Sequence, residues 1–154
     1  MSLPGHPVTE DELKALGFAP HDIDVHAVDV RLPGGIGCEW ATLGDVPDAP
    51  GLYAFTVNDH AALHVTYVGL TTHLWMVTKG RLPRSGGARP GQRYGRPTYA
   101  GLTRQRVNIL VAVELHAGHH VRHWLRTLAI DDLRYEEEAL IQRWRLRQVG
   151  WNVG

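Results

Sequence analysis

The sequence contains very little cysteine: Cys38 is the one cysteine among 154 residues. A single thiol excludes an internal disulfide and any zinc site built from several cysteines, so we expect Cys38 to be a small, partly buried apolar residue. No apolar run approaches the ~20 residues of a membrane span, and the N-terminus lacks the apolar core of a signal peptide. With 44% hydrophobic residues, the chain is long enough for a globular core, and we expect a cytoplasmic protein without a membrane partner.

The middle of the chain lacks acidic residues. Residues 60–113 contain no Asp or Glu and eight basic residues, whereas residues 1–59 contain ten acidic and two basic residues. Seven of the eight basic residues are arginines, whose guanidinium groups match phosphate oxygens in a bidentate way. The segregation predicts a binding segment for a polyanion; the alternative is a solvated basic loop that pairs with the acidic third.

The first half of the sequence predicts one short helix and three strands. Thr9 opens a capping box, which predicts a helix from about Glu10 to Leu16. Alternation of apolar and polar residues predicts a strand over residues 23–32. Residues 40–50 are typical of a helical turn followed by a proline-rich connector. The apolar stretches 51–57 and 64–70, joined by a short connection, predict two neighbouring antiparallel strands.

The second half predicts a helix over about residues 72–80, a loop rich in Gly, Pro and Arg, and a central strand over residues 107–115. A last helix is predicted to begin at Asp131 or Asp132 and to end at Gly150. These elements indicate an α+β (α/β) fold, in which helices flank a small, mostly antiparallel sheet of three or more strands.

Four short motifs occur in a defined order. "GLY" at 51–53 and "YVG" at 67–69 lie on consecutive predicted strands. "EEEALI" at 136–141 is on the last predicted helix, and "WN" follows at 151–152. From Pro50 to Asn152 the chain resembles the GIY-YIG nuclease superfamily. The resemblance implies a GIY-YIG-like nuclease domain at residues 49–154. Residues 1–48 are then an N-terminal extension, a short helix plus a strand, packed on this core.

The resemblance also implies catalytic roles. Tyr53 and Tyr67 would lie side by side, and one of them would take a proton from the attacking water. Glu137 would bind Mg²⁺ (or Mn²⁺), and Asn152 would orient the catalytic groups by hydrogen bonds. A tyrosine normally titrates near pH ~10, so a catalytic phenol needs nearby cations. The alternatives are packing roles for the tyrosines and a helix-dipole role for the acidic first turn, which suits Glu136 and Glu138.

One expected residue is missing. Ten residues after Tyr67, the family has an arginine and this sequence has Val77. If the predicted helix continued, Arg81 would lie one turn further on the same face, and Leu82 completes the Arg-Leu pair of the family. We therefore predict that Arg81 supplies the guanidinium, with Arg84 as the next choice.

These features predict a metal-dependent DNA endonuclease that hydrolyses phosphodiester bonds, either restriction-like or stand-alone, with RNA not excluded as substrate. The oligomeric state is open between monomer and homodimer. One alternative is a structure-specific nicking nuclease of repair or recombination. The other is a non-catalytic nucleic-acid-binding domain that has lost the helix arginine. The residues expected to contact nucleic acid are Lys79, Arg84, Arg89, Arg93, Arg96 and Arg104.

Two further groups of residues have alternative interpretations. His116, His119, His120 and His123 recur at helical spacing, which a zinc site on one face would show; a polar surface hairpin is the favoured interpretation. Trp75, Trp124 and Trp144 are expected in the core rather than as base-stacking platforms.

Overall fold

The structure is a computed structural model that describes residues 2–32, 35–82 and 99–153, with side chains from residue 106 onward in the last range. Its elements in chain order are β1 (His6–Pro7), α1 (Glu10–Ala15), β2 (Ala19–Asp29), β3 (Gly37–Thr42), β4 (Gly51–Asn58), β5 (Leu63–Thr71), the 3-10 helix η1 (Leu74–Val77), β6 (Lys79–Gly80), α2 (Tyr99–His116), β7 (His120–Thr127), the 3-10 helix η2 (Ile130–Asp132) and α3 (Leu133–Arg143).

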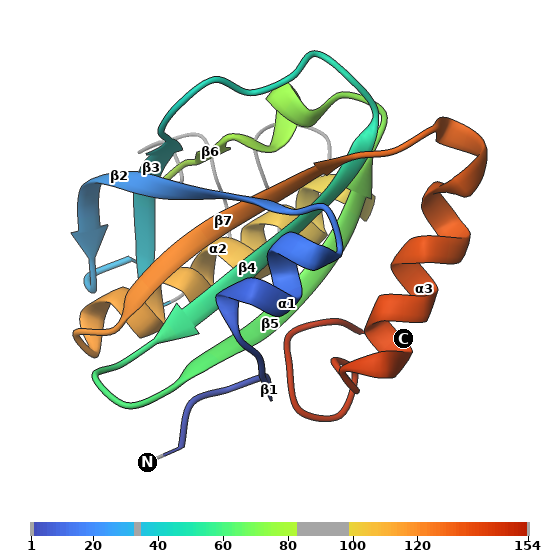
Figure 1. Cartoon of the computed structure of the whole chain (residues 1–154). Helices are drawn as coiled ribbons and strands as arrows, with labels where there is room; N and C mark the ends of the chain where they lie inside the picture. The colour runs from blue at the N-terminus through green and yellow to red at the C-terminus, as the bar shows by residue number, and fades with distance from the viewer. Residues whose placement is uncertain (1, 33–34, 83–98, 154) are drawn as a thin grey trace.

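A seven-stranded sheet with the order β1-β5-β4-β7-β2-β3-β6 organises the described chain (Figure 1). Every strand pair is antiparallel, which confirms the α+β class. The predicted strands 51–57 and 64–70 are β4 and β5, and they pair from Gly51↔Thr71 to Asn58↔Leu63. The first 48 residues contribute β1, β2 and β3 to this sheet; the domain boundary at residue 48 stays a prediction.

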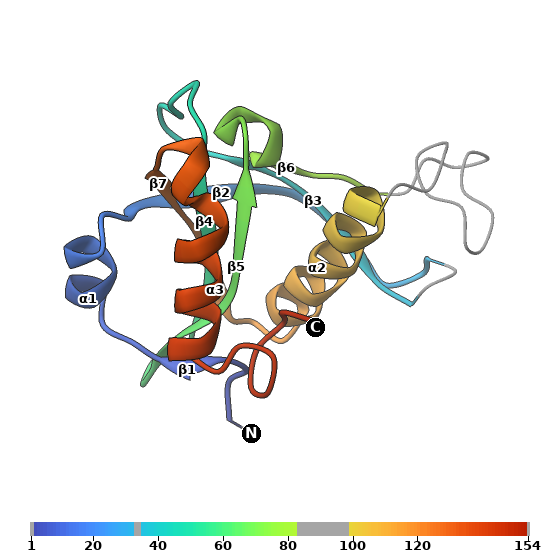
Figure 2. The same ribbon diagram turned by 90° about the vertical axis from the view of Figure 1, so that its right-hand side faces the viewer.

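Helix α2 covers one face of the sheet, and α1 and α3 cover the other (Figure 2). Strand β4 contributes side chains to the cores on both faces of the sheet, because successive side chains of a strand point to opposite sides. Tyr53 and Phe55 join the cluster that contains Val107 and Val111 of α2. Leu52 and Ala54 join the cluster of α1 and α3, together with Leu13, Leu140 and Ile141. The sheet therefore separates two apolar cores.

The predicted strand over residues 107–115 is wrong, because this stretch lies inside helix α2. Val107, Val111 and Ala112 are buried against the sheet, whereas Val113 is 44% exposed. This burial follows helical spacing and leaves one side of the apolar run in solvent. An apolar run alone does not distinguish a buried strand from a helix.

The predicted helix over residues 72–80 is also wrong. The helical part is limited to Leu74–Val77, and the next strand, β6, pairs with β3 at Trp40↔Gly80. The Thr78 hydroxyl donates to the Trp75 carbonyl at 2.9 Å, and this local bond closes the turn in competition with a longer helix. The predicted helical turn within residues 40–50 is also wrong, because Trp40 and Thr42 belong to strand β3.

The predicted N-terminal helix is confirmed, and Thr9 caps it by accepting a hydrogen bond from the Glu12 amide at 3.1 Å. The predicted strand 23–32 is β2, shifted toward the N-terminus. The C-terminal helix begins as predicted but ends at Arg143 rather than Gly150. Arg145 then adopts a positive φ of 53°, which turns the chain back toward β5.

The expectations about four single residues have different outcomes. Trp124 and Trp144 are in the core as expected, and Cys38 is fully buried rather than partly buried. The expectation for Trp75 is wrong, because its side chain is 56% exposed on η1. Among the described residues, no helix is both long enough and apolar enough to cross a membrane.

Candidate functional site

The two motif tyrosines lie side by side on neighbouring strands. The ring centroids of Tyr53 and Tyr67 are 5.8 Å apart, with an angle of 43° between the ring planes. Both side chains are buried in the core on the α2 face and contact Phe55. The antiparallel pairing of β4 and β5 produces this adjacency, because it aligns Tyr53 with Gly69 and Phe55 with Tyr67.

Gly69, the last residue of "YVG", makes room for the Tyr53 phenol. A Cβ atom at this position would lie 2.4 Å from Cζ and 2.6 Å from the hydroxyl oxygen of Tyr53. These separations are far inside van der Waals contact, so a side chain at residue 69 would displace the ring. The phenol of Tyr53 therefore lies directly over the backbone of β5 at Gly69.

The outer edge of β5 carries the other two motif residues. The Asn152 side chain pairs with Val68 as a strand would: its Oδ1 accepts from the Val68 amide at 3.1 Å, and its Nδ2 donates to the Val68 carbonyl at 2.8 Å. Two residues along the strand, the Leu70 backbone amide hydrogen-bonds to the Glu137 carboxylate. Alternate residues of a strand point the same way at a spacing of about 7 Å. Asn152 and Glu137 therefore reach neighbouring positions on one edge.

This segment of β5, residues 68–70, brings four of the five predicted catalytic residues into one region. Tyr53 covers Gly69, Tyr67 is the next residue before the segment and packs on Tyr53, and Asn152 and Glu137 bind its edge. We call this region the β5-edge site. A backbone bond from Trp151 to the Thr66 carbonyl, 2.7 Å long, holds the C-terminal segment against the same edge.

The three consecutive glutamates of α3 have different surroundings. Glu136 forms an ion pair with Arg126 at 3.3 Å. Glu138 accepts two hydrogen bonds from Arg147, at 2.7 and 2.6 Å, and these bonds lower the pKa of Glu138 to about 2. Within the described part of the chain, Glu137 takes part in no ion pair. It is half-buried instead.

Burial raises the pKa of Glu137, and the charge of Glu138 raises it further; the Leu70 amide and the charges of Arg134 and Arg147 oppose the rise. A half-buried carboxylate without a paired cation retains its capacity to bind a positive ligand. Carboxylate oxygens are the ligands that Mg²⁺ prefers, and water and phosphate oxygens commonly complete its shell. Glu137 is thus the residue of the β5-edge site that fits a divalent metal.

The structure does not support the helical argument for Arg81. Val77 is buried in the cluster on the α2 face, and Arg81 follows β6 instead of continuing a helix. The Arg81 carbonyl accepts a hydrogen bond from the Asn108 side chain of α2 at 3.0 Å. In the strand order, β7, β2 and β3 stand between β4 and β6. Helix α2, which packs near both, is the element that connects Arg81 to the tyrosines.

The burial of Arg106 and His123 was not predicted from the sequence, which placed His123 on a polar surface hairpin. Arg106 is half-buried on α2, and its Nη2 atom is buried without a hydrogen-bond partner. His123 is fully buried, stacks on Phe55 at 4.6 Å and places its Nδ1 2.9 Å from the Thr42 hydroxyl. Burial lowers the pKa of His123 to about 3.

The proposed hairpin or zinc face at residues 116–123 does not form as one surface. His116 ends α2 and His120 begins β7, while His123 is in the core. The His119 Nδ1 donates a 2.6 Å hydrogen bond to the Glu114 carboxylate. In the part of the chain that the structure describes, no three His, Cys, Asp or Glu side chains gather as a metal-binding group.

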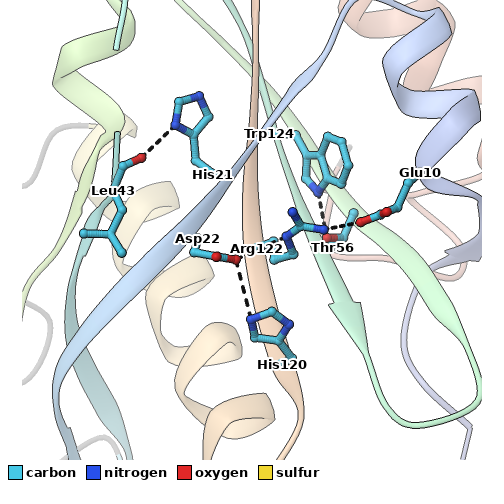
Figure 3. A network of polar contacts seen from close by, with 8 residues as sticks. All are labelled: Glu10, His21, Asp22, Leu43, Thr56, His120, Arg122 and Trp124. Atoms are coloured by element: carbon cyan, nitrogen blue, oxygen red, sulfur yellow. Dashed lines mark hydrogen bonds and ion pairs between the residues drawn. The ribbon is translucent and has the colours of Figure 1, made fainter. Parts of the chain in front are cut away.

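A second polar cluster surrounds Arg122 of β7 (Figure 3). The guanidinium group pairs with Glu10 of α1 and lies 3.3 Å from Asp22 of β2. It also stacks over the Trp124 ring at 5.2 Å. His120 lies 3.7 Å from the same Asp22 carboxylate. We call this the Arg122 cluster; it ties the N-terminal elements to β7 through paired charges.

Several predicted nucleic-acid contacts lie outside the described residues. These are Arg84, Arg89, Arg93 and Arg96, and the side chain of Arg104. Lys79, by contrast, is exposed on β6. Comparisons with protein-family models, curated proteins and solved structures return no match.

Proposed function

We propose that the protein is a Mg²⁺- or Mn²⁺-dependent endonuclease of the GIY-YIG type that hydrolyses phosphodiester bonds in DNA. The observation that carries the proposal is the β5-edge site, where Glu137 lacks an ion-pair partner and interacts with Leu70, two residues from the Val68 that Asn152 binds, on the strand whose Gly69 lies under the Tyr53 phenol. Partial burial of a carboxylate that has no paired cation costs free energy. Carboxylates in such positions are typical of functional sites.

Each residue of the site has a chemical task in this proposal. Glu137 would hold the metal, and the chemistry that the metal would supply is neutralisation of the phosphate and of the leaving oxygen. Tyr53 or Tyr67 would receive the proton of the attacking water as a phenolate. Asn152 fixes the edge of β5, because its two hydrogen bonds to Val68 hold the strand that positions Glu137 and Tyr53.

The charge distribution supports a nucleic-acid substrate. Residues 60–113 carry eight basic residues and no acidic residue, and they include the segment that directly follows the β5-edge site. Arginine-rich segments supply the phosphate contacts that dominate DNA affinity. Arg81 remains our prediction for the guanidinium that stabilises the transition state, now as a residue that follows β6.

A second candidate is a DNA-binding domain without cleavage activity, and buried Val77 at the arginine position favours it. Nicking of supercoiled plasmid in Mg²⁺, in Mn²⁺ and in EDTA distinguishes the two. We expect nicking that requires the metal and disappears in Glu137→Gln. Binding without nicking in either metal would leave the non-catalytic domain as the function.

A further inference from the structure

One tryptophan differs from the other four. Trp75 is 56% exposed, whereas Trp40, Trp124, Trp144 and Trp151 are at most 5% exposed. Its neighbour Met76 is 43% exposed. The Trp75 side chain is thus the tryptophan that a ligand in solvent can reach.

The turn that presents Trp75 is firmly anchored. Leu74 and Val77 are buried on either side of the exposed pair. The Leu74 amide donates to the Ala49 carbonyl at 2.9 Å and the Met76 amide to the His73 carbonyl at 3.0 Å. The Thr78 hydroxyl binds the carbonyl of Trp75 itself. The indole is therefore displayed by a fixed backbone, and little conformational entropy remains to be lost when it binds a partner.

This turn lies at the same end of the sheet as the β5-edge site. β5 ends at Thr71, which pairs with Gly51, and η1 begins three residues later. A Cβ atom at Gly51 would lie 2.9 Å from Leu74, so η1 sits on the start of β4. Leu70, whose amide binds Glu137, is five residues before Trp75.

The surroundings of Trp75 favour a polyanion. Lys79 and Arg81 follow it and are exposed, and the sequence from 60 to 113 has no acidic residue. The ring of His73 lies 6.2 Å from the indole. Asp48 is the acidic residue next to the turn, and it is 3.5 Å from His73. An exposed aromatic ring in a segment rich in basic residues is the combination that binds unpaired nucleobases.

We propose that Trp75 stacks on an unpaired nucleobase next to the phosphate that is cleaved, so that the enzyme prefers single-stranded or locally unpaired substrates. This inference rests on the proposed function. Stacking is tolerant of base identity because every base has a π face, so Trp75 selects strand structure rather than sequence.

Binding in EDTA tests the inference separately from cleavage. Fluorescently labelled oligo(dT) and a blunt duplex of equal length are titrated with wild type, Trp75→Ala, Trp75→Phe, and two control variants. Met76→Ala removes the neighbouring apolar side chain, which is 43% exposed, and Tyr135→Ala removes an aromatic ring that is 78% exposed on α3. We expect Trp75→Ala to weaken oligo(dT) binding about tenfold, Trp75→Phe to weaken it less, and both controls to bind as wild type.

The intrinsic fluorescence gives an independent readout. Oligo(dT) should quench the wild-type emission, and Trp75→Phe should lose this quenching, because the four remaining tryptophans are buried. Near-UV circular dichroism verifies that the variants are folded.

Unchanged oligo(dT) affinity in Trp75→Ala, or an equal loss on the blunt duplex, overturns the proposal. A shift in oligomeric state caused by Trp75→Ala, without a change in DNA affinity, would assign the ring to a protein contact instead. If the wild type binds oligo(dT) through Trp75 but does not cleave in Mg²⁺ or Mn²⁺, the nuclease proposal fails while the stacking role remains.

Discussion

The β5-edge site and the Arg122 cluster both contain charged side chains, but they use them differently. In the Arg122 cluster, the guanidinium faces Glu10 and Asp22, and its flat surface covers Trp124. At the β5-edge site, Glu137 faces a backbone amide and its pKa is raised. Paired charges hold elements together, whereas an unpaired, half-buried carboxylate reduces stability and is available to a ligand.

The same contrast occurs within one turn of α3. Glu136 and Glu138 are each neutralised by an arginine, Arg126 and Arg147 respectively, and Glu137 between them is not. A helix turns by about 100° per residue, so consecutive side chains point in different directions. Glu137 alone of the three points to the edge of β5. This comparison leads to four predictions, given from the largest expected effect to the smallest.

Replacing Glu137 should have the largest effect. We expect Glu137→Gln to reduce metal-dependent cleavage by orders of magnitude, because a catalytic metal ligand is lost. The folded-state pKa of Glu137 is raised, so its contribution to stability is present at low pH and is lost as pH rises through that pKa. Above it, the ionised side chain destabilises the fold. The amide should therefore leave the melting temperature at pH 7 unchanged or higher. Nicking assays and thermal melts check both effects.

Glu136→Gln and Glu138→Gln are the matched controls. Both should retain cleavage, and each should change the melting temperature little, because ion pairs near the protein surface contribute little to stability. Normal cleavage in Glu137→Gln together with an inactive Glu138→Gln would shift the metal ligand by one residue.

Replacing Arg81 should have the next largest effect. We expect Arg81→Ala to reduce cleavage by roughly 10²-fold with binding largely kept, because the guanidinium acts on charge that develops in the transition state. Arg81→Lys should recover little activity, since a point charge does not reproduce a bidentate fork. Single-turnover rates and DNA affinities separate the two effects.

The control variants for Arg81 are Arg84→Ala and Arg106→Met. Full activity in Arg81→Ala beside an inactive Arg106→Met would assign the role to α2, where the Nη2 atom of Arg106 is buried without a partner. An inactive Arg84→Ala would move the assignment three residues along the chain.

The buried His123 should make stability depend on pH. Its pKa falls from 6.5 in the unfolded chain to about 3 in the folded protein, through burial and then the charge of His21. The unfolded state thus binds more protons between these values, so stability is full above pH 6.5 and is lost as pH falls toward 3. The loss is a few kcal/mol, because one pKa unit corresponds to about 1.4 kcal/mol.

Denaturant melts from pH 7 to pH 4 measure this loss. His123→Phe should flatten the profile, whereas His120→Phe, at an exposed position, should keep it. If His123→Phe leaves the profile unchanged, other groups cause the pH dependence. Glu137 is not among them, because its raised pKa changes the stability in the opposite direction.

Breaking the Arg122 cluster should have the smallest effect. Arg122→Met leaves Glu10 and Asp22 without their shared cation and removes the contact with Trp124. We expect a loss of about 1 to 2 kcal/mol of stability, reduced by solvent screening, and an unchanged cleavage rate per folded molecule. A selective loss of cleavage with normal stability would contradict the structural role of this cluster.

The sequence predicted the elements whose patterns are local. Thr9 and its capping box located α1, and the alternation and short connection of "GLYAFTV" and "HVTYVGL" located β4 and β5. It failed where neighbours decide the structure. The apolar residues 107–115 are compatible with strand and helix alike, and only packing against the sheet selects helix α2. Residues 79–80 form a strand because their backbone pairs with the edge of β3.

The candidate site divides in the same way. The sequence by itself determined which residue types stand at Tyr53, Tyr67, Glu137 and Asn152, and their order along the chain. Only the tertiary structure decided that Glu137 and Asn152 bind alternate residues of the β5 edge and that Glu136 and Glu138 are neutralised. It also decided that Trp75 faces solvent and His123 does not. The physical reason is that burial and pairing depend on residues far apart in the sequence, which no local pattern records.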